Sequence, residues 1–269
     1  MSNNLAGSTS YIQLAPSNHP SNSTISYRDG NPIINFILGE QDRYLIGSSV
    51  RVMGNIAIYK TPDGAGFGNI PLKTDDLNIS PKLGIYGILD QVTLSSQKSK
   101  NVIESVRHYG TFLSSYLPNL SSKQEALGHM SVTSGMVPNP LMIQETFVNN
   151  LNGSSATSRN FRGNSFCINL PTGFLMSKES INLSGRGGGV GGLEFALHLA
   201  PDSQVLNGSW TNAFYQLTDV NLVCEVINPS VDELSRMMSK TSATMEYNAI
   251  SSYYQTIASS NAIINFRLG

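Results

Sequence analysis

The glycine-rich stretch from Gly187 to Gly192 is the most recognisable chemical pattern in the sequence, because it matches G-x-G-x-x-G. In dinucleotide-binding proteins these glycines follow a strand and open a helix whose amino terminus meets the pyrophosphate. Here the next segment, Leu193 to Ala200, alternates apolar and polar side chains and predicts a strand. The pattern therefore indicates a flexible or tightly turned loop with no bound cofactor, in which Arg186 is solvated.

Histidines and paired carboxylates are the other residues that could do chemistry, but their spacing assembles no site. No histidine belongs to an H-E-x-x-H motif or has a Cys-x-x-Cys companion, and no G-x-S-x-G motif occurs. We therefore expect no metal site, no catalytic residue and no enzymatic activity, with the acidic pairs in a surface loop or at a helix start. These residues are His19, His108, His129, His198, Asp75-Asp76 and Asp232-Glu233.

The two cysteines, Cys167 and Cys224, each lie in a strand-like apolar segment. Nothing in the sequence indicates a secretory route, since Met1 to Ser10 has neither a charged region nor an apolar run. Two buried thiols are therefore expected rather than a disulfide.

The composition is unusually poor in charge. Charged residues make up 13% of the 269 residues, against roughly 25% in an ordinary soluble domain. Asn, Ser, Thr and Gln take their place, and neutral polar surfaces tend to associate. The net charge is −1 and like charges form no block, whereas a nucleic-acid binder needs a basic stripe or arm. The composition favours a protein that packs among copies of itself and makes no direct contact with nucleic acid.

Short strand-like segments follow one another along the chain, with Gly- and Pro-rich turns between them and no β-α-β alternation. Gly54 interrupts one segment and predicts a bulge or bend. The predicted fold is all-β, an eight-stranded antiparallel jelly roll or β-sandwich with short inserted helices. The predicted strands cover 33–38, 50–59, 83–94, 166–170, 193–200 and 219–227, and a turn cluster covers 61–69.

Three helices are predicted as insertions. Apolar residues between Ser99 and Tyr116 recur at helical spacing, and Pro118 is expected to end that helix. A short helix is predicted over 121–127. A third begins at Ser230, which forms the S-x-x-E capping pattern with Glu233.

The domain organisation is predicted from texture and from one internal repeat. Residues 1–30 are rich in Ser, Asn and Pro and predict an extended arm, and residues 31–247 form the jelly roll. Residues 31–39 and 261–269 are identical except at their second and seventh positions. If the first copy opens a barrel, the second can open another. Residues 248–269 are therefore a tail or the start of a second jelly roll.

The order of these elements resembles the first jelly roll of the major capsid proteins of polinton-like viruses and virophages, in the double-jelly-roll lineage that includes adenovirus hexon. The strand-to-helix segment with Ile103-Glu104 and Tyr109 resembles an I-E-x-x-x-x-Y pattern common in these proteins. The other stretches that carry the resemblance are 33–56, 84–96, 166–175, 191–200 and 215–229. Family members usually hold two barrels, whereas this chain has one complete barrel at most.

The resemblance implies a structural subunit of an icosahedral virion, a major capsid protein that self-assembles into capsomers. Its partners would be copies of itself, as a homotrimer or pentamer, and other capsid proteins, with a membrane or minor capsid proteins between shell and genome. One alternative is a single-jelly-roll penton or minor capsid protein. Another is a carbohydrate- or receptor-binding β-sandwich that uses Trp210, Tyr215 or Tyr253 as stacking platforms.

Overall fold

The computed structural model describes residues 7–20, 23–60, 70–71, 77–79, 83–120, 122, 131–135, 164–208 and 213–252. Several predicted features lie outside these residues: the turn cluster 61–69, Asp75-Asp76, the helix 121–127 apart from Ser122, His129, Trp210, Tyr253 and the repeat copy 261–269.

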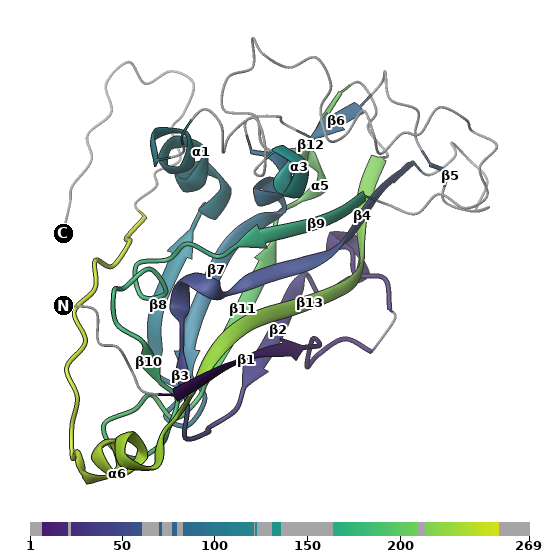
Figure 1. Ribbon diagram of the computed structural model, residues 1–269. Coiled ribbons are helices and arrows are strands. Elements are labelled where there is room, and N and C mark those ends of the chain that lie inside the picture. Colours follow the sequence, from purple (N-terminus) through teal and green to yellow (C-terminus); the bar gives the residue numbers. More distant parts are fainter. Residues whose placement is uncertain are drawn as a thin grey trace.

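Two antiparallel sheets make up the body of the protein (Figure 1). The larger sheet contains β1 (Gly7–Leu14), β13 (Ala213–Pro229), β4 (Arg51–Lys60) and β9 (Asn164–Asn169), with the short strands β3 (Tyr44–Leu45), β5 (Ile70–Pro71) and β10 (Ile181–Asn182). The smaller sheet contains β2 (Ile33–Leu38), β11 (Leu193–Leu199), β7 (Leu89–Ser96) and β8 (Val102–Arg107). A separate ribbon pairs β6 (Leu77–Ile79) with β12 (Leu206–Gly208).

The longer strands are paired in a nested order. The first strand pairs with the last, β1 with β13, and β2 pairs with β11. From there β13 pairs with β4 and β4 with β9, while β11 pairs with β7 and β7 with β8. All these pairs are antiparallel, which is the wrapping of a jelly roll. The predicted fold class, an antiparallel jelly-roll sandwich with short helices, is confirmed.

The core lies between the two sheets and is built from alternate residues of each strand. In the smaller sheet Phe36, Phe195 and Leu94 form one cross-strand row, and each is fully buried. In the larger sheet Leu222 and Cys224 of β13 face the same core. Burial of one such large side chain stabilises the fold by about 2 kcal/mol, so this interior dominates stability.

Short helices lie at both ends of the sandwich, with α1 and α3 at one end and α6 at the other (Figure 1). The helices are α1 (Tyr109–Leu120), α3 (Ser131–Ser134), α5 (Asp202–Val205) and α6 (Val231–Ser239), with 3-10 turns η1 (Tyr27–Asp29), η2 (Gly47–Ser49) and η3 (Gly84–Ile88). None of the described helices is both long and apolar enough to cross a membrane.

The helix predicted between Ser99 and Tyr116 is confirmed only in its second half. Residues 102–107 form β8, and α1 starts only at Tyr109 and continues two residues past Pro118 to Leu120. A spacing of four residues places Val102 and Val106 on one face of a helix but also on one face of a strand. The third predicted helix is confirmed as α6, where the Ser230 side chain accepts a hydrogen bond from the Glu233 N–H at 3.3 Å.

The irregularity predicted at Gly54 lies in the neighbouring strand. β4 continues through Gly54, while β13 shifts register between Thr218 and Asn221, with Asp219 at φ 53°. A side chain at Gly54 would meet the Phe166 ring at 3.0 Å and the Thr218 carbonyl at 3.2 Å. The glycine therefore makes room beside a bulge of its partner strand.

The predicted arm contains a strand of the barrel. β1 pairs with β13 along its whole length, and its Ser10, Ile12 and Leu14 side chains are half-buried. The next segment covers β2, because the Asn18 side chain donates to the Ile33 carbonyl and accepts from the Asn35 N–H. The repeat copy at 31–39 therefore holds β2, the second strand of the sandwich, and does not open the barrel.

Candidate functional site

The glycine-rich loop lies between β10 and β11 and is a turn, as predicted. Gly187, Gly188, Gly191 and Gly192 all have φ between 63° and 80°, the left-handed region that favours glycine. A strand follows the loop, so no helix amino terminus faces it. The loop thus lacks the geometry of a pyrophosphate site.

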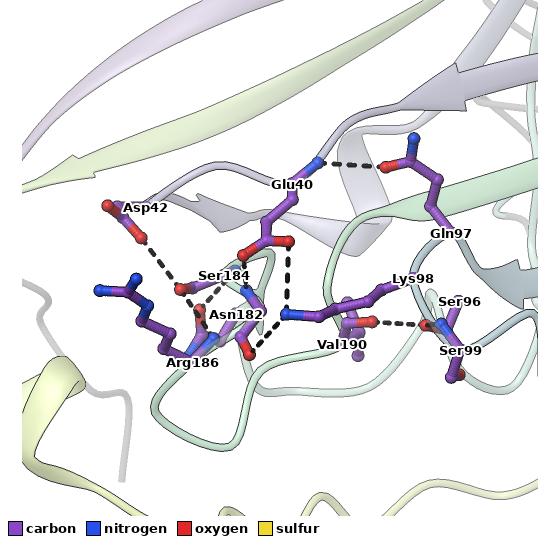
Figure 2. A network of polar contacts seen from close by, with 11 residues as sticks. Glu40, Asp42, Ser96, Gln97, Lys98, Ser99, Asn182, Ser184, Arg186 and Val190 are labelled. Carbon is purple, nitrogen blue, oxygen red and sulfur yellow. Dashed lines mark hydrogen bonds and ion pairs between the residues drawn. The ribbon is translucent and has the colours of Figure 1, made fainter.

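A polar network ties this loop to two neighbouring turns (Figure 2). The Glu40 carboxylate accepts a hydrogen bond from the Gly185 N–H at 2.9 Å and lies 3.6 Å from the Lys98 ammonium. The Ser184 hydroxyl donates to Asp42 at 2.9 Å. Beneath these groups, the buried Ser96 hydroxyl donates to the Val190 carbonyl at 2.7 Å. Together these contacts fix the loop to the turns after β2 and β7.

The charges in this network are structural. The side chains of Lys98 and Glu40 are 58% and 43% exposed, so water screens their attraction and the ion pair contributes little stability. Arg186 is exposed, as predicted. The arrangement can hold loops together, but it presents no nucleophile with an adjacent base.

The same glycine-rich loop lies against the end of α6 and against the chain that follows it. A side chain at Gly187 would collide with the Met237 carbonyl, and one at Gly188 would collide with the backbone of Ser242 and Ala243. These glycines therefore allow close approach of the carboxyl-terminal segment, which is their clearest role in the described structure.

A second polar site surrounds Glu104, a carboxylate only 5% exposed. Three backbone N–H groups donate to it: Gly173 at 3.0 Å, Phe174 at 2.8 Å and Ile250 at 2.9 Å. Two of these donors lie in the loop after β9 and the third lies far along the chain. From the sequence, Glu104 is identified only as part of the I-E-x-x-x-x-Y pattern. The one sequence signal for this polar site is a charged residue at a position of β8 that faces the core.

Beside Glu104 is a surface hollow of about 730 Å³. One wall carries Phe112 and Tyr116 of α1, whose stacked ring centroids are 5.1 Å apart. The lining also includes Met176 and Tyr247, together with Lys178, Glu246 and other polar residues. Apolar and charged groups are thus mixed along the hollow, without a converging set of catalytic groups.

The described histidines do not converge. His19 Nε2 lies 2.9 Å from the Ile33 carbonyl oxygen, and His108, predicted on a helix, lies between β8 and α1 with Nδ1 3.5 Å from Asp90. His198 faces outward from β11 as predicted; partial burial lowers its pKa, opposed by nearby Asp90. The described residues contain no cluster of three or more His, Cys, Asp or Glu able to hold a metal.

The remaining candidate residues are structural. Cys167 and Cys224 are free thiols, as predicted, but only Cys224 is buried, whereas Cys167 is partly exposed. Burial raises the pKa of Cys224 to about 11. Asp232 and Glu233 lie in the first turn of α6. Tyr215 is fully buried, with its hydroxyl donating to the Ala200 carbonyl at 2.6 Å. The hypothesis that Tyr215 is an exposed stacking platform is therefore wrong.

No family model and no curated protein sequence matches this chain. Among solved structures the chain is similar to the Sputnik virophage structure determined by cryo-EM, with 11% identity, a TM-score of 0.48, and coverage of 84% of this chain and 49% of that one. It is also similar to PBCV-1 VP54 fitted into a reconstruction of Sputnik (12%, 0.45, 87% and 45%). A third similar structure is the mavirus major capsid protein (11%, 0.34, 83% and 47%). The chain spans about half the length of each of these proteins.

Proposed function

We propose that this protein is a structural subunit of an icosahedral viral capsid, located in the virion, and that it acts by self-association. The observation that carries the proposal is the outer face of the smaller sheet, which is half-buried and uncharged at its centre. One cross-strand row there consists of Asn35, Ala196, Thr93 and Ser105. Short side chains of this kind allow another layer to approach closely.

Three polar side chains of this face are already paired with one another. The Gln91 amide donates to Thr93 Oγ1 and to Ser105 Oγ, each at 3.0 Å, and the two hydroxyls lie 3.1 Å apart. A polar group buried without a partner costs free energy, whereas a satisfied one costs much less. A neighbouring subunit can therefore cover Gln91, Thr93 and Ser105 without supplying matching donors and acceptors, whereas the buried Asn35 Oδ1 has no hydrogen-bond partner among the described residues.

Charges lie toward the margins of the same face. The Glu194 carboxylate pairs with the Lys100 ammonium at 2.8 Å. Arg107 is exposed at the end of β8. An uncharged centre with a charged rim is the usual pattern of a protein–protein interface. In the capsid, marginal charges would set the orientation of neighbours more than the strength of the contact.

The finer form of the proposal follows the family resemblance of the sequence. We infer a major capsid protein that forms homotrimeric capsomers and contacts other capsid proteins, with no direct role in binding nucleic acid. The repeat at 261–269 supports a second barrel that begins with an equivalent of β2. Because the described residues form one barrel, a single-jelly-roll penton that forms pentamers is the second candidate.

The first test is the mass of the native particle by light scattering coupled to gel filtration, with negative-stain images of the same peak. We expect trimers, pentamers or closed shells built from the 29.1 kDa chain. A stable monomer that binds a glycan column would overturn the proposal in favour of a carbohydrate-binding module.

A variant pair sharpens this test. Ala196→Arg places an unpaired charge in the centre of the proposed face, and it should shift the protein to monomers while the far-ultraviolet circular dichroism stays unchanged. Gln204→Arg adds the same charge at an exposed position of α5 and should assemble normally. Equal assembly of both variants would exclude the outer face of the smaller sheet as the interface.

A further inference from the structure

We propose that the barrel carries a peptide-docking site whose ligand is this chain's own segment 241–252, here called the strap. The site is formed by β8, by the loop 171–174 and by the glycine-rich loop. The strap begins where α6 ends at Ser239 and Lys240. In this proposal the strap binds as an extended peptide and can leave and rebind while the barrel stays folded. It does not depend on the capsid role.

Glu104 provides the polar recognition. Its carboxylate accepts the Ile250 N–H at 2.9 Å in a setting that is 5% exposed. The same carboxylate holds the loop through the Gly173 and Phe174 N–H groups. Hydrogen bonds to an ionised acceptor in a water-poor setting are strong, so Glu104 is a preorganised anchor for one backbone N–H of the ligand.

Tyr247 provides the aromatic recognition. Its ring meets the Phe174 ring edge to face, with centroids 5.3 Å apart, and its hydroxyl donates to the Ile103 carbonyl at 3.1 Å. Ser252 adds a hydrogen bond from its hydroxyl to the Arg107 carbonyl at 2.7 Å. The donors thus reach carbonyl groups at both ends of β8, the last strand of the smaller sheet.

Glycines shape the groove around the strap backbone. A side chain at Gly173 would collide with the Asn248 carbonyl, just as one at Gly188 would collide with Ser242 and Ala243. Two separate loops therefore have a glycine at the position where the strap backbone passes. This complementarity at two distant points indicates a built groove rather than a chance contact.

The strap is held mainly through side chains, which is why we infer that it is releasable. Among the described residues, no backbone-to-backbone hydrogen bond joins 241–252 to the barrel. The strap residues that pack against the core are Met245, Tyr247 and Ile250, and most other strap residues are exposed. Segments with few buried contacts open at lower free energy than the core. The ligand class is thus an extended peptide with apolar, aromatic and apolar residues at these positions.

The decisive experiment supplies the strap in trans. In the full chain, Tyr247→Ala with Ile250→Pro removes the ring contact and the N–H that Glu104 accepts, and so empties the site. A fluorescently labelled peptide of residues 242–252 should bind this opened chain, measured by fluorescence polarisation. It should not bind the wild-type chain, whose site is occupied, and an Ile250→Pro peptide should not bind either chain.

Glu104 is tested within the opened chain. Adding Glu104→Ala should weaken peptide binding at least about tenfold, the scale expected for loss of a hydrogen bond to a charged acceptor. Glu194→Ala removes a carboxylate from the outward side of the same sheet and should leave binding unchanged. Equal binding by the wild-type and opened chains, or no effect of Glu104→Ala, would overturn the proposal.

Hydrogen exchange tests whether the strap is releasable even if the opened chain does not fold. In the wild-type chain, the Ile250 amide, whose N–H Glu104 accepts, should exchange faster than the amides of β13, and the milder Glu104→Gln should speed Ile250 exchange several-fold without changing β13. Identical exchange of the Ile250 amide and of β13 would show that the strap leaves only when the barrel unfolds, which contradicts a releasable ligand. Because these measurements need no assembly, they stand apart from the test of the capsid proposal.

Discussion

The hydroxyl group of Tyr109 donates a hydrogen bond to the carbonyl oxygen of Pro171 at 3.2 Å, from a side chain that is fully buried. Tyr109 is the first residue of α1, and Pro171 begins the loop that Glu104 also holds. Glu104 of β8 and Tyr109 of α1, both in the I-E-x-x-x-x-Y pattern, therefore hold the same loop by hydrogen bonds. The pattern joins the smaller sheet to the end of β9 in the larger one.

Tyr109→Phe tests this link. The substitution keeps the ring but leaves the Pro171 carbonyl without its donor, so we expect a loss of about 1 to 3 kcal/mol in the free energy of unfolding. Urea denaturation followed by circular dichroism measures it. Tyr11→Phe is the matched control, since Tyr11 is 75% exposed. A loss no larger than that of the control would mean that the hydrogen bond contributes nothing.

Phe195→Ala tests the core of the smaller sheet. Phe195 lies between Phe36 and Leu94 and is fully buried, so its truncation should cost about 3 to 5 kcal/mol. Thermal unfolding of the two variants Phe195→Ala and Ile37→Ala gives the comparison. Ile37 lies on the adjacent strand and is 38% exposed, and its truncation should cost clearly less. Similar costs would argue against the sandwich core described above.

Stability should fall at alkaline pH. Burial raises the pKa of Cys224 from 9.0 to about 11 and that of Tyr86 from 10.0 to about 12. The unfolded chain loses these protons at lower pH than the folded chain, so the folded chain binds more protons above pH 9 and its stability decreases as pH rises. Burial likewise raises the pKa of Tyr109 and Tyr215. Urea midpoints measured from pH 8 to 11 should decline steadily.

Cys224→Ala isolates the thiol contribution to this decline. A pKa raised by about two units corresponds to roughly 3 kcal/mol between pH 9 and 11, and the variant should lose that part of the pH dependence. Its lower stability at pH 8 does not matter, because slopes are compared. An unchanged slope would assign the decline to the buried phenols instead.

Gly187→Ala tests the contact between the glycine-rich loop and the end of α6. Gly187 has φ 63° and an added side chain would meet the Met237 carbonyl, whereas Gly30 has φ 78° with nothing within 4 Å. Backbone strain alone costs about 1 to 2 kcal/mol at such positions. We therefore expect Gly30→Ala to lose about that much stability and Gly187→Ala to lose more. Equal losses, measured by urea denaturation, would remove the packing role of Gly187.

The sequence predicts the strands that alternate strictly. β11 and most of β13 place one apolar side chain in every two residues toward the core. The predicted strand 193–200 matches β11 to one residue, and the predicted strand 219–227 lies inside the longer β13. The region of Val102 and Val106 was assigned to a helix because a four-residue spacing satisfies both periods. The sequence of β1 indicates an arm because residues 1–30 are rich in Ser, Asn and Pro.

The Glu104 site could not be predicted from the sequence alone. Its donors are backbone N–H groups at 173, 174 and 250, and a backbone N–H leaves no trace in residue type. The glycine loop posed the same difficulty: its left-handed turns were inferable, but its contact with Met237 and Ala243 depends on where the chain returns.

The pairing of β1 with β13 brings Gly7 opposite Pro229. During synthesis, the first strand must wait unpaired until almost the whole described barrel has emerged from the ribosome. Local helices can form early, but the sheet edge at β1 stays open for that time, and such edges invite pairing with other nascent chains. Because β1 pairs with the last described strand, we expect slower translation to prolong the exposure of this edge and to lower the yield of folded protein.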